Sequence, residues 1–373
     1  MSASMDDADA KARSGAPSVA RDPVEEQVLA TWRFVLESSD IAVDDNFFKI
    51  GGTSLDALDA SWRLGEIFGI ELPLDMFVES PTVRDLAERI RTQRIGGGWR
   101  PIVRLREGTG RPPFFCVHPI DGNVLCYTEL AAEMEEGQPF YAFQARGLDA
   151  NEEPHADFAG MAEDYVAAMR SSQKRGPYYL GGWSVGGLVA LEMAQRLRAA
   201  GETVALLVLF DTLYPAVSPR RRSWFDRLLR ADDAAERREL EQYVLDDPQP
   251  APAAYEAVHT LHELYLEQAY SYRPARYDGR ITLMMAEAQL DRVQDALKLF
   301  RDARVRRLIG RGGKYLRRLE RVERMSPLHW RTVASRGFEM HAIPGDHLSM
   351  IRGANARHLA ACLGECIRRA PTG

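Results

Sequence analysis

Hydrophobic residues in the first quarter of the chain recur at helical spacing. From Pro23 to Val35 they return every three or four positions, and proline is tolerated in the first turn of a helix. A second helix is expected from about Ser54, with an apolar side made of Leu55, Leu58, Trp62 and Leu64. A third should follow Pro81-Thr82 and run to about Ile90. Three helices with short connections predict a small all-helical bundle.

The rest of the chain alternates between short apolar runs and helical patterns. The runs expected to be strands are Pro113–His118, Phe140–Ala145, Tyr178–Gly182, Thr203–Asp211, Arg280–Ala286 and Phe338–Ile343. The helical patterns are Asp157–Gln173, Val185–Ala199 and about Asn355–Arg369. Several of the runs are continuously apolar, as parallel strands covered on both faces are. The alternation predicts an α/β fold with a mostly parallel sheet.

Two long stretches interrupt this alternation. Residues 215–277 are helical and punctuated by prolines, and residues 291–336 contain a basic run. From Arg301 to Arg324 there are ten basic against three acidic side chains. This run is either a solvated helix face or a surface that meets an acidic partner.

Charge divides the chain at a glycine-rich segment. Residues 21–93 carry 15 acidic and 7 basic side chains, whereas the residues from 94 onward are mildly basic. Three consecutive glycines, at 96–98, favour a flexible connection. The predicted organisation is a disordered tail (1–20), a helical domain (21–93), a linker (94–100) and an α/β domain (101–373).

Composition excludes several classes of protein. With 45% hydrophobic residues the chain can bury a large core, and a net charge of −6 argues against nucleic-acid binding. The longest apolar run, Val204–Phe210, is too short to cross a membrane, and the polar first twenty residues do not form a signal peptide. The start at Met1 favours a separate polypeptide, with excision from a larger protein as the alternative.

The four cysteines are too few for a disulfide scaffold. They are Cys116, Cys126, Cys362 and Cys366. We expect them to be reduced, mostly buried thiols in a cytoplasmic protein. No metal site is expected.

The loop before the second helix contains the first candidate site. It reads Asp45-Asn46-Phe47-Phe48-Lys49-Ile50-Gly51-Gly52-Thr53-Ser54-Leu55. The glycines give an open turn, and the Ser54 hydroxyl should then lie at a helix N-terminus, where backbone N–H groups favour phosphate. The alternative is that Ser54 simply caps the helix.

Residues 24–91 resemble the carrier proteins of nonribosomal peptide and polyketide synthases. In that family the serine of D-x-F-F-x-[LI]-G-G-x-S-L carries 4′-phosphopantetheine through a phosphodiester. The resemblance implies Ser54 as the attachment point. It also implies a phosphopantetheinyl transferase and upstream synthase modules as partners. Thr53 is a departure, because peptidyl carriers often have histidine or aspartate there.

The second candidate site is a serine between a strand and a helix. Gly182-Trp183-Ser184-Val185-Gly186 matches G-x-S-x-G, in which glycines permit the strained turn that exposes a nucleophilic serine. Such a serine needs a base that is oriented by an acid, and in α/β-hydrolases the acid and then the histidine follow along the chain. Asp211, at the end of a predicted strand, and His347, in the turn just after the last predicted strand, stand in that order.

Other residues compete for these roles. Glu287 also follows a strand and is the alternative acid, whereas Asp346 more naturally shapes the turn before His347. His118 lies on the wrong loop for a base and is interpreted as a turn residue. The oxyanion needs two backbone donors, for which we expect the N–H groups of Val185 and Ile120.

The residues from about 101 to the end resemble the type I thioesterase domains that terminate nonribosomal peptide and polyketide assembly lines. The matching motifs are P-P-F-F-C-V-H-P, G-W-S-V-G-G, L-F-D and G-D-H-L, in that order. The resemblance implies an α/β-hydrolase with a helical lid at 215–277, and it favours Asp211 over Glu287 as the acid. The segment Ile120-Asp121-Gly122 departs from the family, in which many members have a small residue and two glycines.

The two resemblances together imply a carrier–thioesterase didomain. It would release a peptidyl or polyketide thioester by transfer to Ser184, followed by hydrolysis or cyclisation. Two alternatives are an inactive carrier and docking module, and a serine hydrolase outside assembly-line biosynthesis.

Overall fold

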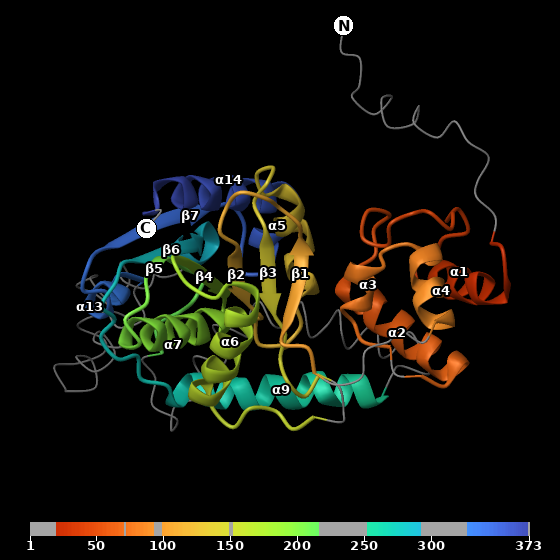
Figure 1. Ribbon diagram of the computed structural model, residues 1–373, viewed down its shortest axis with the longest axis horizontal. Coiled ribbons are helices and arrows are strands. Elements are labelled where there is room, and N and C mark those ends of the chain that lie inside the picture. The colour runs from red at the N-terminus through yellow and green to blue at the C-terminus, as the bar shows by residue number, and fades with distance from the viewer. Residues whose placement is uncertain are drawn as a thin grey trace, which may run out of the picture. The chain divides into compact units, whose positions relative to one another are not determined.

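The chain folds as two compact units, residues 1–97 and 98–373 (Figure 1). The computed structural model describes residues 20–70, 72–92, 99–148, 152–215, 252–291 and 327–371. The predicted tail (apart from Ala20), the basic run at 301–324 and residues 216–251 of the predicted lid lie outside these ranges. Within them, no helix is both long enough and apolar enough to cross a bilayer.

The first unit is all-helical, as predicted. Its helices are α1 (Pro23–Val35), α2 (Ser54–Phe68), α3 (Met76–Glu79) and α4 (Val83–Arg91). Polar side chains at the helix starts explain where α1 and α4 begin: the Asp22 carboxylate accepts the N–H of Val24, and Thr82 accepts that of Asp85. The short helix α3 was not predicted, because four residues are too few to show a helical period.

Aromatic rings form the centre of the first unit. Trp32, Phe47 and Phe77 are fully buried, and the ring centroid of Phe47 lies 4.8 Å from that of Trp32 and 5.1 Å from that of Phe77. The buried face of α2 differs from the predicted one. It consists of Ala57, Asp59, Ala60, Ser61 and Leu64, whereas Leu58 and Trp62 are half-buried. Small side chains form much of this face, so large hydrophobic residues alone did not locate it.

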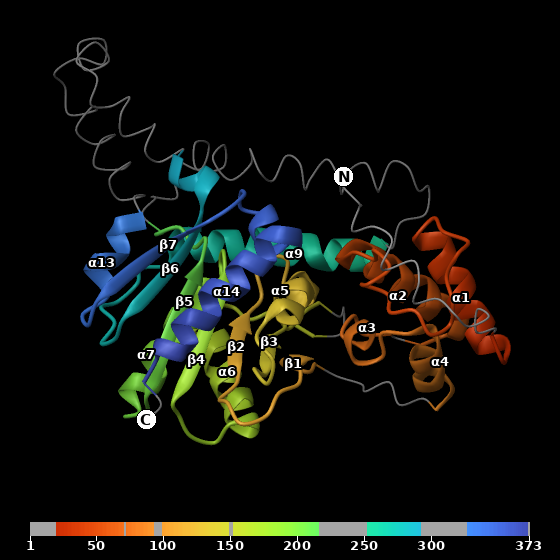
Figure 2. The same cartoon turned by 90° about the horizontal axis from the view of Figure 1, so that it is seen from above.

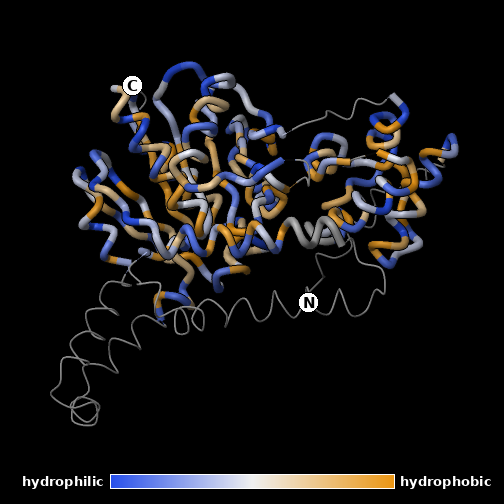
Figure 3. Tube along the Cα trace, turned by 90° about the horizontal axis from the view of Figure 1, so that it is seen from below, coloured by the Kyte–Doolittle hydropathy of each residue, from blue (hydrophilic) through white to orange (hydrophobic). Residues whose placement is uncertain are grey.

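The second unit contains a seven-stranded sheet in the order β1-β3-β2-β4-β5-β6-β7 (Figure 2). Its strands are β1 (Ile102–Arg106), β2 (Phe114–Val117), β3 (Phe140–Phe143), β4 (Tyr178–Trp183), β5 (Val204–Phe210), β6 (Ile281–Ala286) and β7 (Phe338–Ile343). All neighbouring strands are parallel except β1 and β3. The predicted mostly parallel sheet is therefore confirmed. In Figure 3 hydrophobic positions are concentrated in the interior of the second unit.

The antiparallel edge strand β1 was missed from the sequence. It reads Ile-Val-Arg-Leu-Arg, and only Val103 is buried. Charged residues are common on edge strands, where they discourage pairing with other chains, and they mask the strand pattern.

Helices cover both faces of the sheet. The helices are α5 (Thr128–Glu133), α6 (Phe158–Ser172), α7 (Gly186–Ala199), α9 (Pro252–Ser271), α13 (Trp330–Val333) and α14 (Gly353–Arg369). Helices α5 and α14 lie on one face, and α6 and α7 on the other (Figure 1). The main core lies on the α6–α7 side and includes Leu261 and Tyr265 of α9.

His118, at the end of β2, is completely buried in this core. Its Nδ1 lies 2.6 Å from the Pro119 carbonyl oxygen and its Nε2 lies 2.8 Å from the Tyr165 hydroxyl oxygen. Because a carbonyl can only accept, Nδ1 carries the proton and Nε2 accepts from Tyr165. The Tyr165 hydroxyl oxygen also lies 3.1 Å from the Gln144 carbonyl oxygen. Because that carbonyl accepts from Trp99 Nε1 at 3.1 Å, it does not depend on the single Tyr165 proton. The neutral imidazole is therefore fully paired.

Burial lowers the pKa of His118 to about 4, although the Pro119 carbonyl partly opposes this. Between pH 6.5 and 4 the unfolded chain therefore binds a proton that the folded chain does not. We expect this group to remove roughly 2–3 kcal/mol of stability from the second unit between pH 7 and 4.5.

Replacing His118 should abolish this part of the pH dependence. The free energy of unfolding of His118→Gln and of the wild-type chain is measured in urea at pH 7 and 4.5. Hydrogen exchange of β2 and β4 peptides monitors unfolding of the second unit. His358→Gln, at an exposed position on α14, is the matched control. Its free energy of unfolding should fall with pH as much as that of the wild-type chain. An equally steep loss of stability in His118→Gln would contradict the assignment.

Candidate active site

Ser184 lies in the sharp turn between β4 and α7. Its φ of 57° is in the left-handed region, which costs a non-glycine residue about 1–3 kcal/mol. The turn is held because the Ser184 N–H donates to the Phe210 carbonyl at 2.8 Å. A Cβ at Gly182 would lie 2.2 Å from the Gly186 carbonyl oxygen, and one at Gly186 would lie 2.3 Å from that of His118. Both flanking positions therefore require glycine.

Asp211 follows β5 and is buried at the same edge of the sheet. Its φ is 42°, and its N–H donates to the Met284 carbonyl at 2.8 Å. Carboxylate oxygen Oδ1 accepts the N–H of Ala286 at 3.1 Å, and Oδ2 lies 2.7 Å from Nδ1 of His347. The acid is therefore fixed by two strands before it contacts the imidazole.

His347 lies in the loop after β7. Its Nδ1 faces a carboxylate oxygen of Asp211, which accepts, so this nitrogen carries the donated proton and Nε2 is left as the basic nitrogen. The ring centroid of His347 lies 5.1 Å from that of Trp183, the residue before Ser184. The structure thus brings together Asp211 and His347, and places the imidazole beside the serine turn.

The loop that carries His347 is shaped by Asp346, as predicted from the sequence. The Asp346 carboxylate accepts the N–H groups of Leu348 and Ser349 at 3.2 and 2.8 Å. Gly345 has a φ of 97°, and a Cβ there would lie 2.6 Å from both Asn355 Nδ2 and Ser349 Oγ. The histidine is therefore presented by a fixed turn.

The alternative residues lie elsewhere. Glu287 is exposed at the end of β6, while His347 Nδ1 contacts Asp211. His118 has both ring nitrogens occupied by Pro119 and Tyr165, so it is a paired core residue and not only a turn residue.

The two predicted oxyanion donors lie on adjoining backbone segments. Val185 directly precedes α7, and Ile120 lies on the loop after β2. That loop approaches the serine turn closely, since a Cβ on Gly186 would lie 2.3 Å from the carbonyl oxygen of His118, the first residue after β2. Among the residues that the structure describes, the N–H groups of Ile120 and Val185 donate to no protein acceptor. They are available for a ligand.

Tyr127 is a supporting residue that the sequence did not indicate. It is fully buried, its hydroxyl donates to the Val117 carbonyl at 2.6 Å, and it accepts the Trp183 N–H at 3.1 Å. It therefore joins the end of β2 to the end of β4, next to both backbone segments. A tyrosine in a short helical turn carries no sequence pattern that would have revealed this.

In the first unit, Ser54 is the first residue of α2 and Thr53 is its N-cap. The Thr53 hydroxyl accepts the Asp56 N–H at 3.2 Å, and the Asp56 carboxylate accepts the Thr53 N–H at 2.7 Å. This reciprocal capping box is the signal T-x-x-D, which the sequence analysis overlooked. Because Thr53 is the cap, the alternative that Ser54 serves only as the helix cap is wrong.

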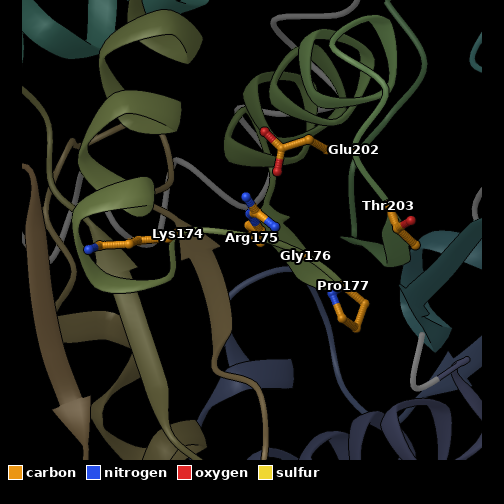
Figure 4. Close-up of a pocket in the computed structure, with 6 residues that line it drawn as sticks. All are labelled: Lys174, Arg175, Gly176, Pro177, Glu202 and Thr203. Atoms are coloured by element: carbon orange, nitrogen blue, oxygen red, sulfur yellow. The ribbon is translucent and has the colours of Figure 1, made fainter.

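A separate cavity of about 380 Å³ lies at the opposite edge of the sheet (Figure 4). It is lined by residues that precede β4 and β5, namely Lys174, Arg175, Gly176, Pro177, Glu202 and Thr203. It lies at the amino ends of these strands, whereas Ser184 and Asp211 follow their carboxyl ends, so the cavity is not part of the candidate site.

Comparison with known proteins identifies both units. Residues 112–365 match the thioesterase domain family, and residues 26–90 match the phosphopantetheine attachment site family. The chain is 40% identical over 195 residues to a dimodular nonribosomal peptide synthase of Bacillus subtilis (strain 168), covering 52% of this chain and 8% of that protein. It is 37% identical over 186 residues to atromentin synthetase nps3 of Serpula lacrymans, covering 48% of this chain and 19% of that protein.

A solved structure is similar over most of the chain. The crystal structure of a four-domain nonribosomal peptide synthetase bound to AMP and glycine aligns with a TM-score of 0.56 and 25% identity, covering 94% of this chain and 26% of that one. The chain thus spans only a small part of the relatives that it matches. It belongs to the thioesterase domain family of α/β-hydrolases, and a phosphopantetheine attachment domain precedes its thioesterase domain.

Proposed function

We propose that the chain releases a peptidyl or polyketide acyl group, carried as a thioester on phosphopantetheine at Ser54, by transfer to Ser184. Hydrolysis or cyclisation then frees the product. The observation that carries this proposal is the 2.7 Å contact between Asp211 and His347 beside the strained serine turn. The acid, base and serine stand in the order that α/β-hydrolases use.

The residues around Ser54 suit covalent attachment of the cofactor. Thr53 and Asp56 satisfy the helix start without Ser54. Gly51, with a φ of 106°, has open space around it, and Thr53 is exposed. When attached, the arm would supply the acyl chain as a thioester.

In the first step the Ser184 hydroxyl attacks the thioester carbonyl. Its proton passes to Nε2 of His347, and Asp211 stabilises the imidazolium through Nδ1–H. Negative charge develops on the carbonyl oxygen, where the N–H groups of Ile120 and Val185 can donate to it. The carbon–sulfur bond then breaks, and the imidazolium returns the proton to the sulfur, which leaves as a thiol.

In the second step the ester on Ser184 is resolved. Water, or an amine or hydroxyl of the substrate, loses a proton to His347 and attacks the ester carbonyl. The carbon–oxygen bond to Ser184 breaks, and the serine recovers its proton from the imidazolium.

Helix α9 of the proposed lid (215–277) packs against the loop after β2, because a Cβ on Gly122 would lie 2.9 Å from Leu261. A cover of this kind limits access of water.

We propose that residues 21–93 form the carrier domain and residues 101–373 the thioesterase domain, joined by the linker 94–100. The matched ranges, 26–90 and 112–365, fall inside these limits. A seven-residue linker spans at most about 25 Å, so the tethered substrate has a high effective concentration at the hydrolase. Upstream synthase modules and a phosphopantetheinyl transferase are the proposed partners.

The acid can be tested with two isosteric substitutions. Asp211→Asn should lower the rate of release about 10⁴-fold, because an amide no longer fixes the imidazole in the productive tautomer. Glu287→Gln is the matched control at the alternative acid and should leave the rate unchanged. Single-turnover release from the acylated chain measures both. A large loss in Glu287→Gln with little loss in Asp211→Asn would assign the acid to residue 287.

The two serines can be tested by loading the chain with an acyl group from acyl-coenzyme A and a phosphopantetheinyl transferase. Intact mass spectrometry should show a loaded wild-type chain that loses its acyl group. Ser184→Ala should load equally and lose it more slowly by a factor on the order of 10⁶. Ser54→Ala should not load at all.

The outcomes separate the alternatives. A wild-type chain that loads but never releases a range of acyl groups would indicate an inactive carrier and docking module. A chain that cannot be loaded at Ser54 yet hydrolyses free esters would indicate a serine hydrolase outside assembly-line biosynthesis.

A further inference from the structure

Four potential metal ligands lie together away from the serine, between β7 and α14. Cys362 and Cys366 are four residues apart on α14 and therefore lie on one face of the helix. Glu339 and His341 are two residues apart on β7 and therefore lie on one face of the strand. These thiols are not part of the proposed release mechanism.

The donor atoms of Cys366 and His341 lie close to those of both other side chains. Cys366 Sγ lies 3.8 Å from His341 Nε2 and 3.7 Å from Glu339 Oε1, and the last two atoms are 3.3 Å apart. The donor atoms of His341, Cys362 and Cys366 all lie within 4.8 Å of one another.

The separations among the donor atoms of Cys366, His341 and Glu339 match the edges of a tetrahedral zinc site, and Cys362 offers a further sulfur close to two of them. Zinc binds sulfur at about 2.3 Å and nitrogen or oxygen at about 2.0–2.2 Å, so neighbouring ligand atoms are about 3.3–3.8 Å apart. We propose that the chain binds one Zn²⁺ through Cys362, Cys366, His341 and Glu339. Two sulfurs and an imidazole favour zinc over magnesium or calcium, which prefer oxygen ligands.

The surrounding charges suit this ion. Two thiolates, one carboxylate and Zn²⁺ sum to −1, and the Arg369 guanidinium lies 3.5 Å from Cys366 Sγ and 3.4 Å from Glu339 Oε1. Arg280 lies 3.7 Å from Oε2 of Glu339, whereas Oε1 is the oxygen that lies near Cys366 and His341. Contacts of this kind orient ligands and balance charge around a metal.

The ligand set indicates a structural site. Four protein ligands close the coordination sphere, whereas catalytic zinc keeps an open position. Strand β7 lies at the edge of the sheet and leads into the loop of His347, and α14 follows that loop. Zinc would therefore tie together the two elements that flank the loop and hold the histidine in place.

Cobalt provides a direct spectroscopic test on the full-length chain. The thiols are first reduced with a phosphine, and bound metal is removed with a chelator. Titration with Co²⁺ should give one equivalent of binding, a thiolate-to-cobalt charge-transfer band in the near ultraviolet and intense visible bands of a tetrahedral ion. Zn²⁺ should abolish these bands and raise the unfolding temperature. Cys362→Ser should weaken binding at least about tenfold, since even a residue that only supports a ligand costs that much.

Cys126→Ser, at a half-buried thiol outside the cluster, is the matched control and should bind like the wild type. His341→Gln should weaken binding as Cys362→Ser does, and it serves if the cysteine variant fails to fold. Any one of three results would overturn the proposal. These are no binding of Co²⁺ or Zn²⁺, a cobalt spectrum without thiolate charge transfer, and a cobalt spectrum that is unchanged in both Cys362→Ser and His341→Gln. None of these readouts depends on release activity.

Discussion

The hydrogen bond between Asp211 and His347 joins residues that are 136 positions apart in the chain. The sheet makes this contact possible, because β5, β6 and β7 are parallel neighbours and their carboxyl ends meet at one edge. The middle strand, β6, fixes the Asp211 carboxylate, because the N–H of its last residue, Ala286, donates to Oδ1 of Asp211. If this bond were lost, the imidazole would have no fixed orientation beside Ser184.

Backbone strain is concentrated at the same edge. Of the residues that the structure describes, only Glu37, Ser184 and Asp211 are non-glycine residues with clearly positive φ. Two of the three belong to the candidate site, and each is held by an N–H donated to a neighbouring strand. Rigid strands thus hold two unfavourable turns at the same edge of the sheet, one carrying Ser184 and the other carrying Asp211.

The sequence predicted the parts of the fold that are buried on both sides. Strands such as β5, Val-Ala-Leu-Leu-Val-Leu-Phe, are continuous apolar runs because helices cover both faces of the sheet. Strand β1 is exposed and charged, so no such run marks it. Similarly, the order of motifs along the chain predicted that Asp211 and His347 would meet, because Asp211 directly follows β5 and His347 lies in the loop after β7.

Contacts that depend on the packing of whole elements could not be predicted. The spacing of Cys362 and Cys366 on a helix was visible, but their approach to His341 requires α14 to lie on β7. Tyr127 bridges β2 and β4 only because its short helix is packed against both strand ends. The capping box of Thr53 and Asp56 was local and could have been recognised.

The most direct test of this account is the protonation state of His347 itself. In a chain labelled with ¹⁵N-histidine, NMR at neutral pH should show one imidazole with a strongly deshielded proton on Nδ1 and an unprotonated Nε2. Both features should disappear for that ring in His347→Gln, and the deshielded proton should be lost in Asp211→Asn. Finding the proton on Nε2 of His347 in the wild-type chain would contradict the account.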